Sequence, residues 1–303
     1  MYEIPVAVPY RLDLTVSVLR RLSANIVDLL TPEGQYVRAL AGSPEAVIVR
    51  VMQNQQKSLS IAIEGDTNNE AELLGLVRKM LGCDRDLMDF EQSATGISWL
   101  APLVQRMQGV KPPRYPTLWE ACVNAIVFQQ LSLASATAIM RRLIVALGQS
   151  VKAEGILVPL HVFPSVESFS RATDDLLRHT GLSGSKIATL RRVAEALTSG
   201  GIDTAKLEQC KSPSVATILC QIKGIGPWTA AVILLRGLGR LDVFPANDTS
   251  VASNIALVSG TATCDTKGLL DTLGRQQGML YFYLLLARLE SRGEIGRPSF
   301  EKL

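Results

Sequence analysis

A glycine-containing segment, Ile-Lys-Gly-Ile-Gly-Pro-Trp-Thr-Ala at residues 222–230, constrains the fold more than any other part of the chain. Gly224 and Gly226 flank one apolar residue, which permits a tight hairpin and lets backbone N–H groups approach a phosphate closely. Pro227 suits the first turn of a helix, where its missing N–H costs nothing. Helical sequence lies on both sides, at 216–221 and 229–238. The segment therefore predicts a helix-hairpin-helix whose second helix presents its N-terminus to a nucleic-acid backbone.

An ordinary tight turn is the alternative, because Gly-x-Gly by itself is a weak phosphate signal. The neighbouring sequence favours the phosphate interpretation. An apolar helix follows at 230–235, and the segment Asp-Val-Phe-Pro-Ala-Asn-Asp follows at 242–248.

The distribution of charge agrees with a nucleic-acid partner, although the net charge of +3 alone does not. Residues 178–240 hold nine Lys and Arg against three acidic residues, a net charge of +6. Residues 1–110 hold ten basic and thirteen acidic residues, a net charge of −3. An excess around the hairpin is what binding to phosphates requires, but a solvated helix face would have the same composition.

Length and composition indicate a globular chain of about two domains, since 303 residues with 47% hydrophobic and 19% charged residues can bury substantial cores. No apolar run approaches the roughly 20 residues that span a bilayer, and no secretory signal is visible, so we expect no membrane partner and a cytoplasmic protein. The five cysteines (83, 122, 210, 220 and 264) form no Cys-x-x-Cys pair. We expect neither a disulfide framework nor a zinc site.

The order of patterns predicts an α+β chain. Residues 1–68 contain a helix around Val16–Leu30 and strands at Tyr36–Leu40, Ala46–Met52 and Ser58–Ile63. From residue 69 the pattern is helical almost to the end, and the proline-rich break at 110–116 marks a boundary. The predicted helices are 70–81, 118–130, 132–147, 165–171, 173–180, 185–198, 204–209, 214–221, 229–238, 249–257, 266–273 and 279–289. Thr117 and Glu120 form the pattern of a capping box.

Two places in the helical part carry polar side chains that suggest chemistry. Gln129 and Gln130 are the last residues of the mostly apolar predicted helix 118–130, where they either contact a nucleic-acid groove or cap the helix–helix corner. Asp248 precedes a helix after a proline-containing turn; its position alone favours an N-cap over catalysis. No second carboxylate is near in sequence, so a two-carboxylate glycosidase is not indicated. His161, in an expected loop, and His179, at a helix end, are expected to be structural.

Residues 110–250 resemble the helix-hairpin-helix DNA glycosylase superfamily, and the whole chain resembles the bacterial 3-methyladenine DNA glycosylase II (AlkA) family. The resemblance is carried by Pro-Pro-Arg-Tyr-Pro-Thr-Leu-Trp-Glu at 112–120, Gln-Gln-Leu-Ser at 129–132, and the segments 181–183, 223–230 and 242–248. The segments 9–13 and 34–38 resemble the N-terminal αβ domain of that family.

The resemblance implies a fold and a domain division. The fold is a small N-terminal αβ (TBP-like) domain followed by an all-α, two-lobed helix-hairpin-helix glycosylase region. The implied boundaries are 1–84 for the αβ domain, 112–240 for the central helical domain, and 85–111 with 241–303 for a second helical lobe that completes the cleft. The implied activity is removal of alkylated purines from double-stranded DNA by base flipping, by a monomer.

The resemblance also implies a role for each matched residue. Asp248 corresponds to the catalytic aspartate, and Gln130 to the side chain inserted where the flipped nucleotide was. Lys223, Gly224, Gly226 and Thr229 correspond to the DNA-binding hairpin, and Trp228 and Gln129 to the base pocket. Backbone carbonyls near Cys220, Ile222 and Ile225 correspond to a site for a structural Na⁺ or K⁺. No cofactor for catalysis is implied.

Departures from the family pattern concern the substrate. Where relatives have aromatic rings around the base, this chain has Val18, Val232 and Ala287, and only Trp228 is aromatic. Trp99, Tyr281 and Tyr283 could compensate, although core packing is the expected role of the tyrosines. Asn247 replaces an acid that is common in relatives.

Two absences narrow the implied reaction. Superfamily members with lyase activity have a lysine two positions after the second hairpin glycine, where this chain has Trp228, so base removal without strand cleavage is expected. No four-cysteine cluster follows Asp248, so no iron–sulfur centre is expected. The competing hypotheses are a non-catalytic helix-hairpin-helix DNA-binding protein and an oxidised-base glycosylase/lyase.

Overall fold

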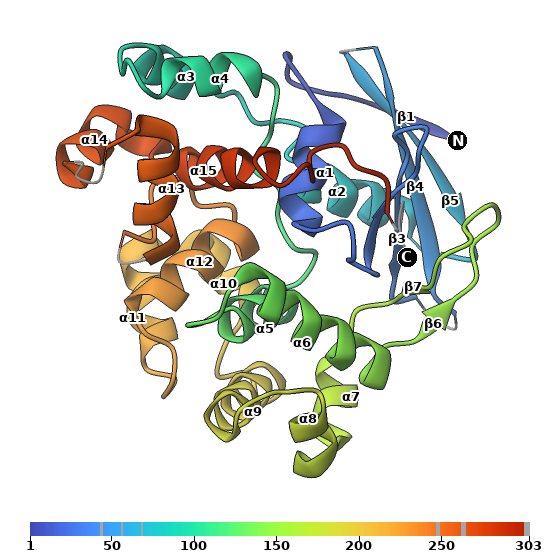
Figure 1. Cartoon of the computed structure of the whole chain (residues 1–303). Coiled ribbons are helices and arrows are strands. Elements are labelled where there is room, and N and C mark those ends of the chain that lie inside the picture. The colour runs from blue at the N-terminus through green and yellow to red at the C-terminus, as the bar shows by residue number, and fades with distance from the viewer. Residues whose placement is uncertain (43–44, 56, 68, 247–248, 262–264, 300–303) are drawn as a thin grey trace.

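A five-stranded antiparallel sheet forms the N-terminal part of the chain (Figure 1). The computed structural model describes residues 1–42, 45–55, 57–67, 69–246, 249–261 and 265–299, with only the backbone of Thr249. The sheet has the order β1-β5-β4-β3-β2. Its strands are β1 Tyr2–Pro5, β2 Asp28–Leu30, β3 Tyr36–Leu40, β4 Val47–Asn54 and β5 Ser58–Glu64.

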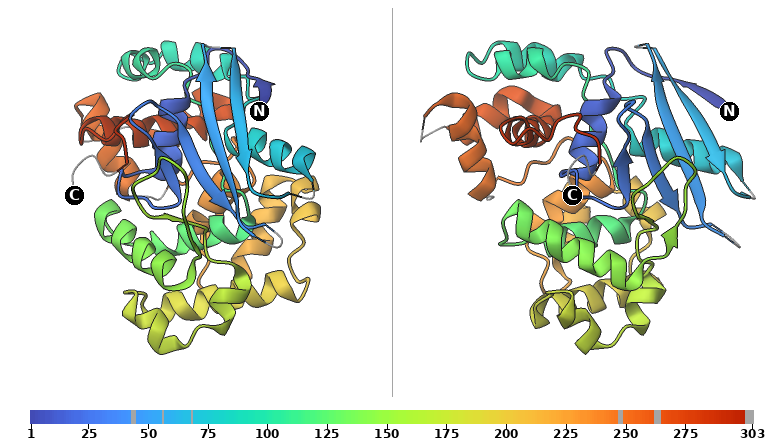
Figure 2. Two further views of the ribbon diagram at one scale, coloured as in Figure 1. Left: turned by 90° about the vertical axis from the view of Figure 1, so that its right-hand side faces the viewer. Right: turned by 45° about the vertical axis from the view of Figure 1, so that its right-hand side comes forward.

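Side-chain alternation along β3 gives the sheet two buried faces. Tyr36 and Leu40 pack with α1 (Leu12–Arg20) and α2 (Glu70–Met80), which cover one face. Val37 and Ala39 point to the other face, where they pack with Leu160 of a distant segment. This segment is a hairpin of two short strands, β6 (Ser150–Val151) and β7 (Leu160–His161), and both views of Figure 2 place it against the sheet.

The remaining described elements are helical. They are α3 Met88–Thr95, α4 Ala101–Arg106, α5 Leu118–Val127, α6 Leu133–Leu147, α7 Val166–Arg171, α8 Asp174–His179, α9 Gly184–Thr198, α10 Thr204–Gln209, α11 Ser212–Cys220, α12 Pro227–Gly237, α13 Thr249–Ser259, α14 Thr266–Leu273, the 3₁₀ turn η1 Gly274–Gln276, and α15 Met279–Glu290.

Two apolar clusters organise these helices. One joins α5, α6 and α9 to α12, with Ile233 of α12 completely buried. The other joins α3, α4 and the C-terminal helices, and takes Leu235 from the same α12. Helix α12 therefore lies between the two clusters. The mixed helical and antiparallel-sheet fold is confirmed, while the division into three domains stays a prediction.

The predicted helix at 16–30 is right as far as Arg20 and wrong beyond it. Helix α1 begins at Leu12 and ends at Arg20, and residues 28–30 form strand β2. Arg21 takes a left-handed φ of 65°, and the side chain of Asn25 accepts hydrogen bonds from the N–H groups of Val27 and Asp28. Between α1 and β2, these local side-chain hydrogen bonds take the place of helical backbone hydrogen bonds.

The expectation of an entirely helical region after residue 69 is also wrong. Ser150 pairs with His161 in the β6–β7 hairpin, so His161 lies in a strand and not in a loop. Strands of two residues leave no periodicity to detect, and their place is set by packing on the sheet. The predicted helix 118–130 ends at Val127, because Gln130 has a left-handed φ of 54°.

Predicted helix starts agree well with the structure, because side-chain caps define them. Thr117, Ser132, Ser165, Thr173 and Ser183 each accept an N–H from the first turn of the helix that follows. The capping box at Thr117 is only half formed, since Glu120 binds Arg38 and not the Thr117 backbone. No helix in the described ranges is long and apolar enough to cross a membrane.

Candidate nucleic-acid interface and active site

Helices α11 and α12 are joined by a tight hairpin at 221–226. The Ile222 carbonyl accepts the Ile225 N–H at 2.9 Å, and Ile225 is buried beneath the turn. Gly224 has a φ of +104°, and a Cβ there would collide with the Thr189 hydroxyl of α9. Glycine is thus required at 224 by both backbone conformation and packing.

Gly226 is required by neither. Its φ is −94°, and a Cβ added there meets no atom within 4 Å. The open space lies at the N-terminus of α12, where Pro227 is the first residue and the first intrahelical bond runs from Ala230 N–H to the Gly226 carbonyl. The N–H groups of Trp228 and Thr229 precede that bond, so they are available to an anion.

Two cationic side chains lie near this helix end, one exposed and one half-buried. Lys223 is exposed, and Arg192 of α9 donates to the Lys223 carbonyl at 3.2 Å. The charge excess expected from sequence is smaller in the fold, because Arg236 is completely buried and Arg240 donates to carbonyls of α10 and Cys210. The remaining basic side chains still make the hairpin surface suitable for a phosphate.

Gln129 and Gln130 have different surroundings. Gln130 is exposed at the turn between α5 and α6. Gln129 is half-buried, and its amide donates to the Gly224 carbonyl at 3.1 Å and to Thr229 Oγ1 at 2.7 Å. Thr229 is buried, so its hydroxyl faces Gln129 and only its backbone N–H is placed for an anion. Gln129 therefore makes a contact within the protein, between the turn and the hairpin, and only Gln130 of the pair is exposed.

Trp228 lies on the first turn of α12, half-buried against the cluster of α5 and α9. Its Nε1 is buried and has no hydrogen-bond partner among the described residues. Val18, Val232 and Ala287 are buried apolar residues. Tyr283 is buried in the core, stacked on Phe90 with ring centroids 5.2 Å apart. Of Trp228 and Tyr283, Trp228 is the one that lies next to the hairpin, and Tyr283 belongs to the core.

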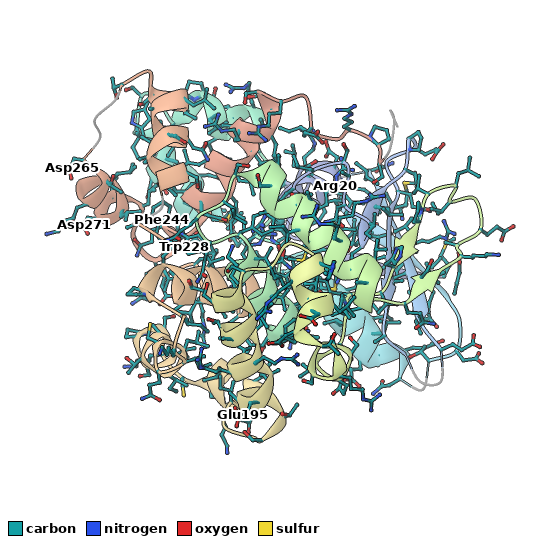
Figure 3. The ribbon with its side chains drawn as sticks, turned by 60° about the horizontal axis from the view of Figure 1, so that its bottom comes forward. Arg20, Glu195, Trp228, Phe244, Asp265 and Asp271 are labelled. Carbon is teal, nitrogen blue, oxygen red and sulfur yellow. The ribbon has the colours of Figure 1, made fainter. Side chains whose placement is uncertain are left out.

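Asp248 lies outside the described residues, as does Asn247. Helix α13 begins at Thr249, the residue that follows Asp248 in sequence. Figure 3 shows the labelled acids Glu195, Asp265 and Asp271 at the periphery of the molecule, away from Trp228.

An open groove of about 690 Å³ lies beside the hairpin. It is lined by α11 and by one face of α12, together with Phe244 and Gln277. Cys220, Gln221 and Pro227 contribute from the hairpin side, whereas Trp228 does not line it. The groove and Trp228 thus occupy different faces of the first turn of α12.

The carbonyls proposed for a monovalent cation lie at the end of α11 and in the hairpin. The last carbonyls of a helix have no intrahelical partner, so this is a chemically suitable place. Ile222 already accepts one N–H, which leaves its oxygen one lone pair. In the described part of the chain, no cluster of His, Cys, Asp or Glu could hold a metal ion.

Two side chains of this region carry no role predicted from the sequence. Lys186 and Thr189, both on α9, contact the turn and the hairpin respectively. One feature of the sequence indicates that Lys186 has a tertiary partner. It is the third residue of α9, where a positive charge is unfavourable unless a group outside the helix binds it.

The hairpin, its open glycine and the helix end behind it have the geometry of a helix-hairpin-helix motif. The profile of the HhH-GPD superfamily of base excision DNA repair proteins matches residues 123–274, half of the chain, and the chain belongs to this superfamily.

Relatives of known name agree with this membership. The chain is 26% identical over 196 residues to the DNA-3-methyladenine glycosylase of Bacillus subtilis (strain 168), covering 65% of this chain and 64% of that protein. It is 34% identical over 134 residues to DNA-3-methyladenine glycosylase 1 of Schizosaccharomyces pombe, covering 44% of this chain and 54% of that protein. The matches thus span less than two thirds of these relatives.

Solved structures show the same fold over more of the chain. The 3-methyladenine DNA glycosylase of Archaeoglobus fulgidus superposes with a TM-score of 0.81 at 21% identity, covering 96% of this chain and 99% of that one. The Schizosaccharomyces pombe 3-methyladenine DNA glycosylase in complex with abasic DNA gives 0.55 at 25% identity, covering 67% and 98%.

Proposed function

We propose that the protein is a monofunctional DNA glycosylase that removes alkylated purines of the 3-methyladenine type from duplex DNA in base excision repair. The observation that carries the proposal is the hairpin, with a buried Ile225, a sterically required Gly224 and open space at Gly226 before a free helix N-terminus. This arrangement suits a DNA phosphate and reads no base. Membership of the HhH-GPD superfamily and relatives named for 3-methyladenine supply the reaction class.

The proposed chemistry begins with extrusion of the damaged base, because the glycosidic bond inside a duplex cannot be reached. Alkylation gives the purine a positive charge, so the base leaves neutral as its bond to C1′ breaks. The Asp248 carboxylate stabilises the positive charge that develops on the sugar. Water then adds to C1′, and its proton goes to the carboxylate or to solvent.

Lyase activity is not part of the proposal. A Schiff base needs an amine at the sugar, and the position where lyases of the superfamily have lysine is Trp228. An indole nitrogen cannot serve, since its lone pair belongs to the ring. Trp228 is instead assigned to the base pocket, where a ring can stack on an electron-poor purine.

A monovalent cation, Na⁺ or K⁺, at the hairpin carbonyls of Cys220, Ile222 and Ile225 completes the proposal. Such a cation would help to attract a DNA phosphate to the turn. Catalysis itself requires no cofactor in this scheme, and one copy of the chain supplies all the residues named, so we propose that it acts as a monomer. DNA binding in Na⁺, K⁺ and choline chloride at equal ionic strength tests the cation; equal affinities in all three would reject it.

Base release from defined duplexes tests the function. Wild type and Asp248→Asn are incubated with duplexes carrying 3-methyladenine or hypoxanthine, and released base is measured by chromatography. The wild type is expected to release base, and Asp248→Asn to be slower by about 10²–10³-fold with unchanged DNA affinity, because only charge stabilisation is lost.

Two results would contradict the proposal. Tight binding by the wild type without release of any base from a lesion panel would favour a non-catalytic DNA-binding protein. Trapping of a covalent protein–DNA adduct by borohydride would favour an oxidised-base glycosylase/lyase.

A further inference from the structure

The turn between α5 and α6, residues 128–131, projects beside the hairpin. Gln130 in this turn has a left-handed φ of 54°, which residues other than glycine rarely adopt. The side chain of Gln130 is exposed, while the preceding helix α5 is buried along its whole length. A conformation of this kind persists where surrounding contacts impose it.

One set of contacts joins the turn to the hairpin. The Gln129 amide uses both of its donors, on the Gly224 carbonyl at 3.1 Å and on Thr229 Oγ1 at 2.7 Å. Gly224 belongs to the hairpin, and Thr229 to the first turn of α12. The Gln129 side chain therefore connects the N-terminus of α12, where the phosphate is proposed to bind, to the turn that carries Gln130.

A second set comes from α9. The Lys186 ammonium group donates to the carbonyl of Val127 at 2.8 Å and to that of Gln129 at 2.9 Å. These are C-terminal carbonyls of α5 and its turn, where a cation is favourable. Lys186 is also the third residue of α9, where a cation is unfavourable, and burial lowers the pKa of its ammonium group. The two carbonyls of the turn offset this unfavourable position on α9.

A third contact reaches the turn from α1. The Arg21 guanidinium lies 3.7 Å from the ring centroid of Phe128, and Arg21 is itself buried with a left-handed φ of 65°. A cation over an aromatic face is attractive. The turn is thus held from α1, from α9 and from the hairpin.

We infer that Lys186 is a positioning residue that fixes the 128–131 turn to α9 while Gln129 joins it to the hairpin, so that phosphate binding and insertion of Gln130 occur as one rigid step. The inference rests on the proposed function, in which a base is extruded from the duplex. Extrusion is costly when the base is paired and stacked, and easier when it is already unpaired. Loss of Lys186 should therefore slow action on paired lesions much more than on unpaired ones.

The experiment compares Lys186→Met, Lys186→Arg and Lys206→Met with wild type. Lys206 is a matched control, because it is also the third residue of its helix (α10) but has an 82% exposed side chain. Single-turnover release of 3-methyladenine is measured opposite thymine and opposite an abasic site. Unstacking is measured separately by the fluorescence of 2-aminopurine next to the lesion. Thermal unfolding of each variant checks that it folds.

Lys186→Met is expected to slow release opposite thymine by about 10²-fold, as displacement of a reacting group by about 1 Å can do, with a much smaller loss opposite the abasic site. It should also abolish the 2-aminopurine signal. Lys186→Arg should restore most of both, and Lys206→Met should match wild type. An equal loss on both substrates, or a paired-lesion rate equal to wild type, would overturn the inference.

Failure of the proposed function gives a different result. If wild type releases no base, the glycosylase proposal fails, and the 2-aminopurine signal alone decides the inference. Its presence in wild type and absence in Lys186→Met would support the positioning role. An absent signal in wild type, or an equal signal in both, would overturn it.

Discussion

Arg38 donates a 2.6 Å hydrogen bond to Glu120, and with both side chains buried this contact joins strand β3 to helix α5. Arg38 also donates to Asp28 at 2.6 Å, and Tyr36 donates to the same carboxylate. The N-terminal sheet is thus attached to the helix whose C-terminus leads into the 128–131 turn. Asp28, Arg38 and Glu120 form one buried network, so each carboxylate that is removed costs Arg38 one of its two ion pairs.

Neutralising Glu120 should therefore lower the free energy of unfolding. Glu120→Gln is expected to destabilise the protein by about 1.5–3 kcal/mol, because Arg38 stays paired with Asp28 but loses one charge-assisted hydrogen bond. Urea unfolding measures the change. Asp84→Asn is the control, since the Asp84–Arg78 pair is exposed and should cost less than about 1 kcal/mol. Equal losses in the two variants would contradict a special role for the buried pair.

The two hairpin glycines should respond differently to alanine. Gly224→Ala should destabilise the protein by about 1–3 kcal/mol, because the new Cβ meets Thr189 and φ is +104°. Gly226→Ala should cost less than about 1 kcal/mol, as a change at an N-cap. Its DNA affinity should fall about tenfold, by the 1.4 kcal/mol that blocking one phosphate contact would remove. Thermal unfolding and DNA titration separate the two effects; unchanged DNA binding by a folded Gly226→Ala would argue against a phosphate there.

Lys223 should contribute to DNA binding through charge alone. Lys223→Met is expected to weaken binding to all sequences alike and to reduce the slope of log affinity against log salt by about 1. Lys57→Met, an exposed lysine before strand β5, should leave the slope unchanged. Titrations at several salt concentrations measure it. A loss confined to one DNA sequence would indicate base reading and contradict the expectation.

His161 should make stability depend on pH. Burial, and to a smaller degree the nearby Arg141, lower the pKa of His161 from 6.5, and its Nδ1 has no partner among the described residues. The unfolded chain then binds a proton near pH 6.5 while the folded chain does not, so stability falls as pH drops below about 6.5.

Urea unfolding at pH 7.5 and pH 5.5 tests this sign. His161→Gln should lose part of the decrease seen in wild type, whereas His179→Gln, at an exposed histidine, should keep it. An identical decrease in all three proteins would show that other groups cause it.

The parts of the candidate site that depend on neighbouring residues in the sequence could be predicted from the sequence. The hairpin at 222–230, the start of α12 at Pro227 and the capped helix starts were all visible, because glycine, proline and capping residues act within a few residues of their own positions. Side-chain partners were not visible. Gln129 was assigned to a base pocket, and the structure shows its amide bound to Gly224 and Thr229, a bond between residues about a hundred positions apart.

Residue types at short spacing are enough to predict the hairpin, the order of the helices and their capped starts, and the resemblance to a known family singles out Asp248 as the candidate acid. Packing between distant segments is needed to place Lys186 on the end of α5, to pair Glu120 with Arg38 instead of completing its capping box, and to make residues 28–30 a strand. These contacts form because folding brings distant polar groups together in places without water, where each buried donor and acceptor needs a partner.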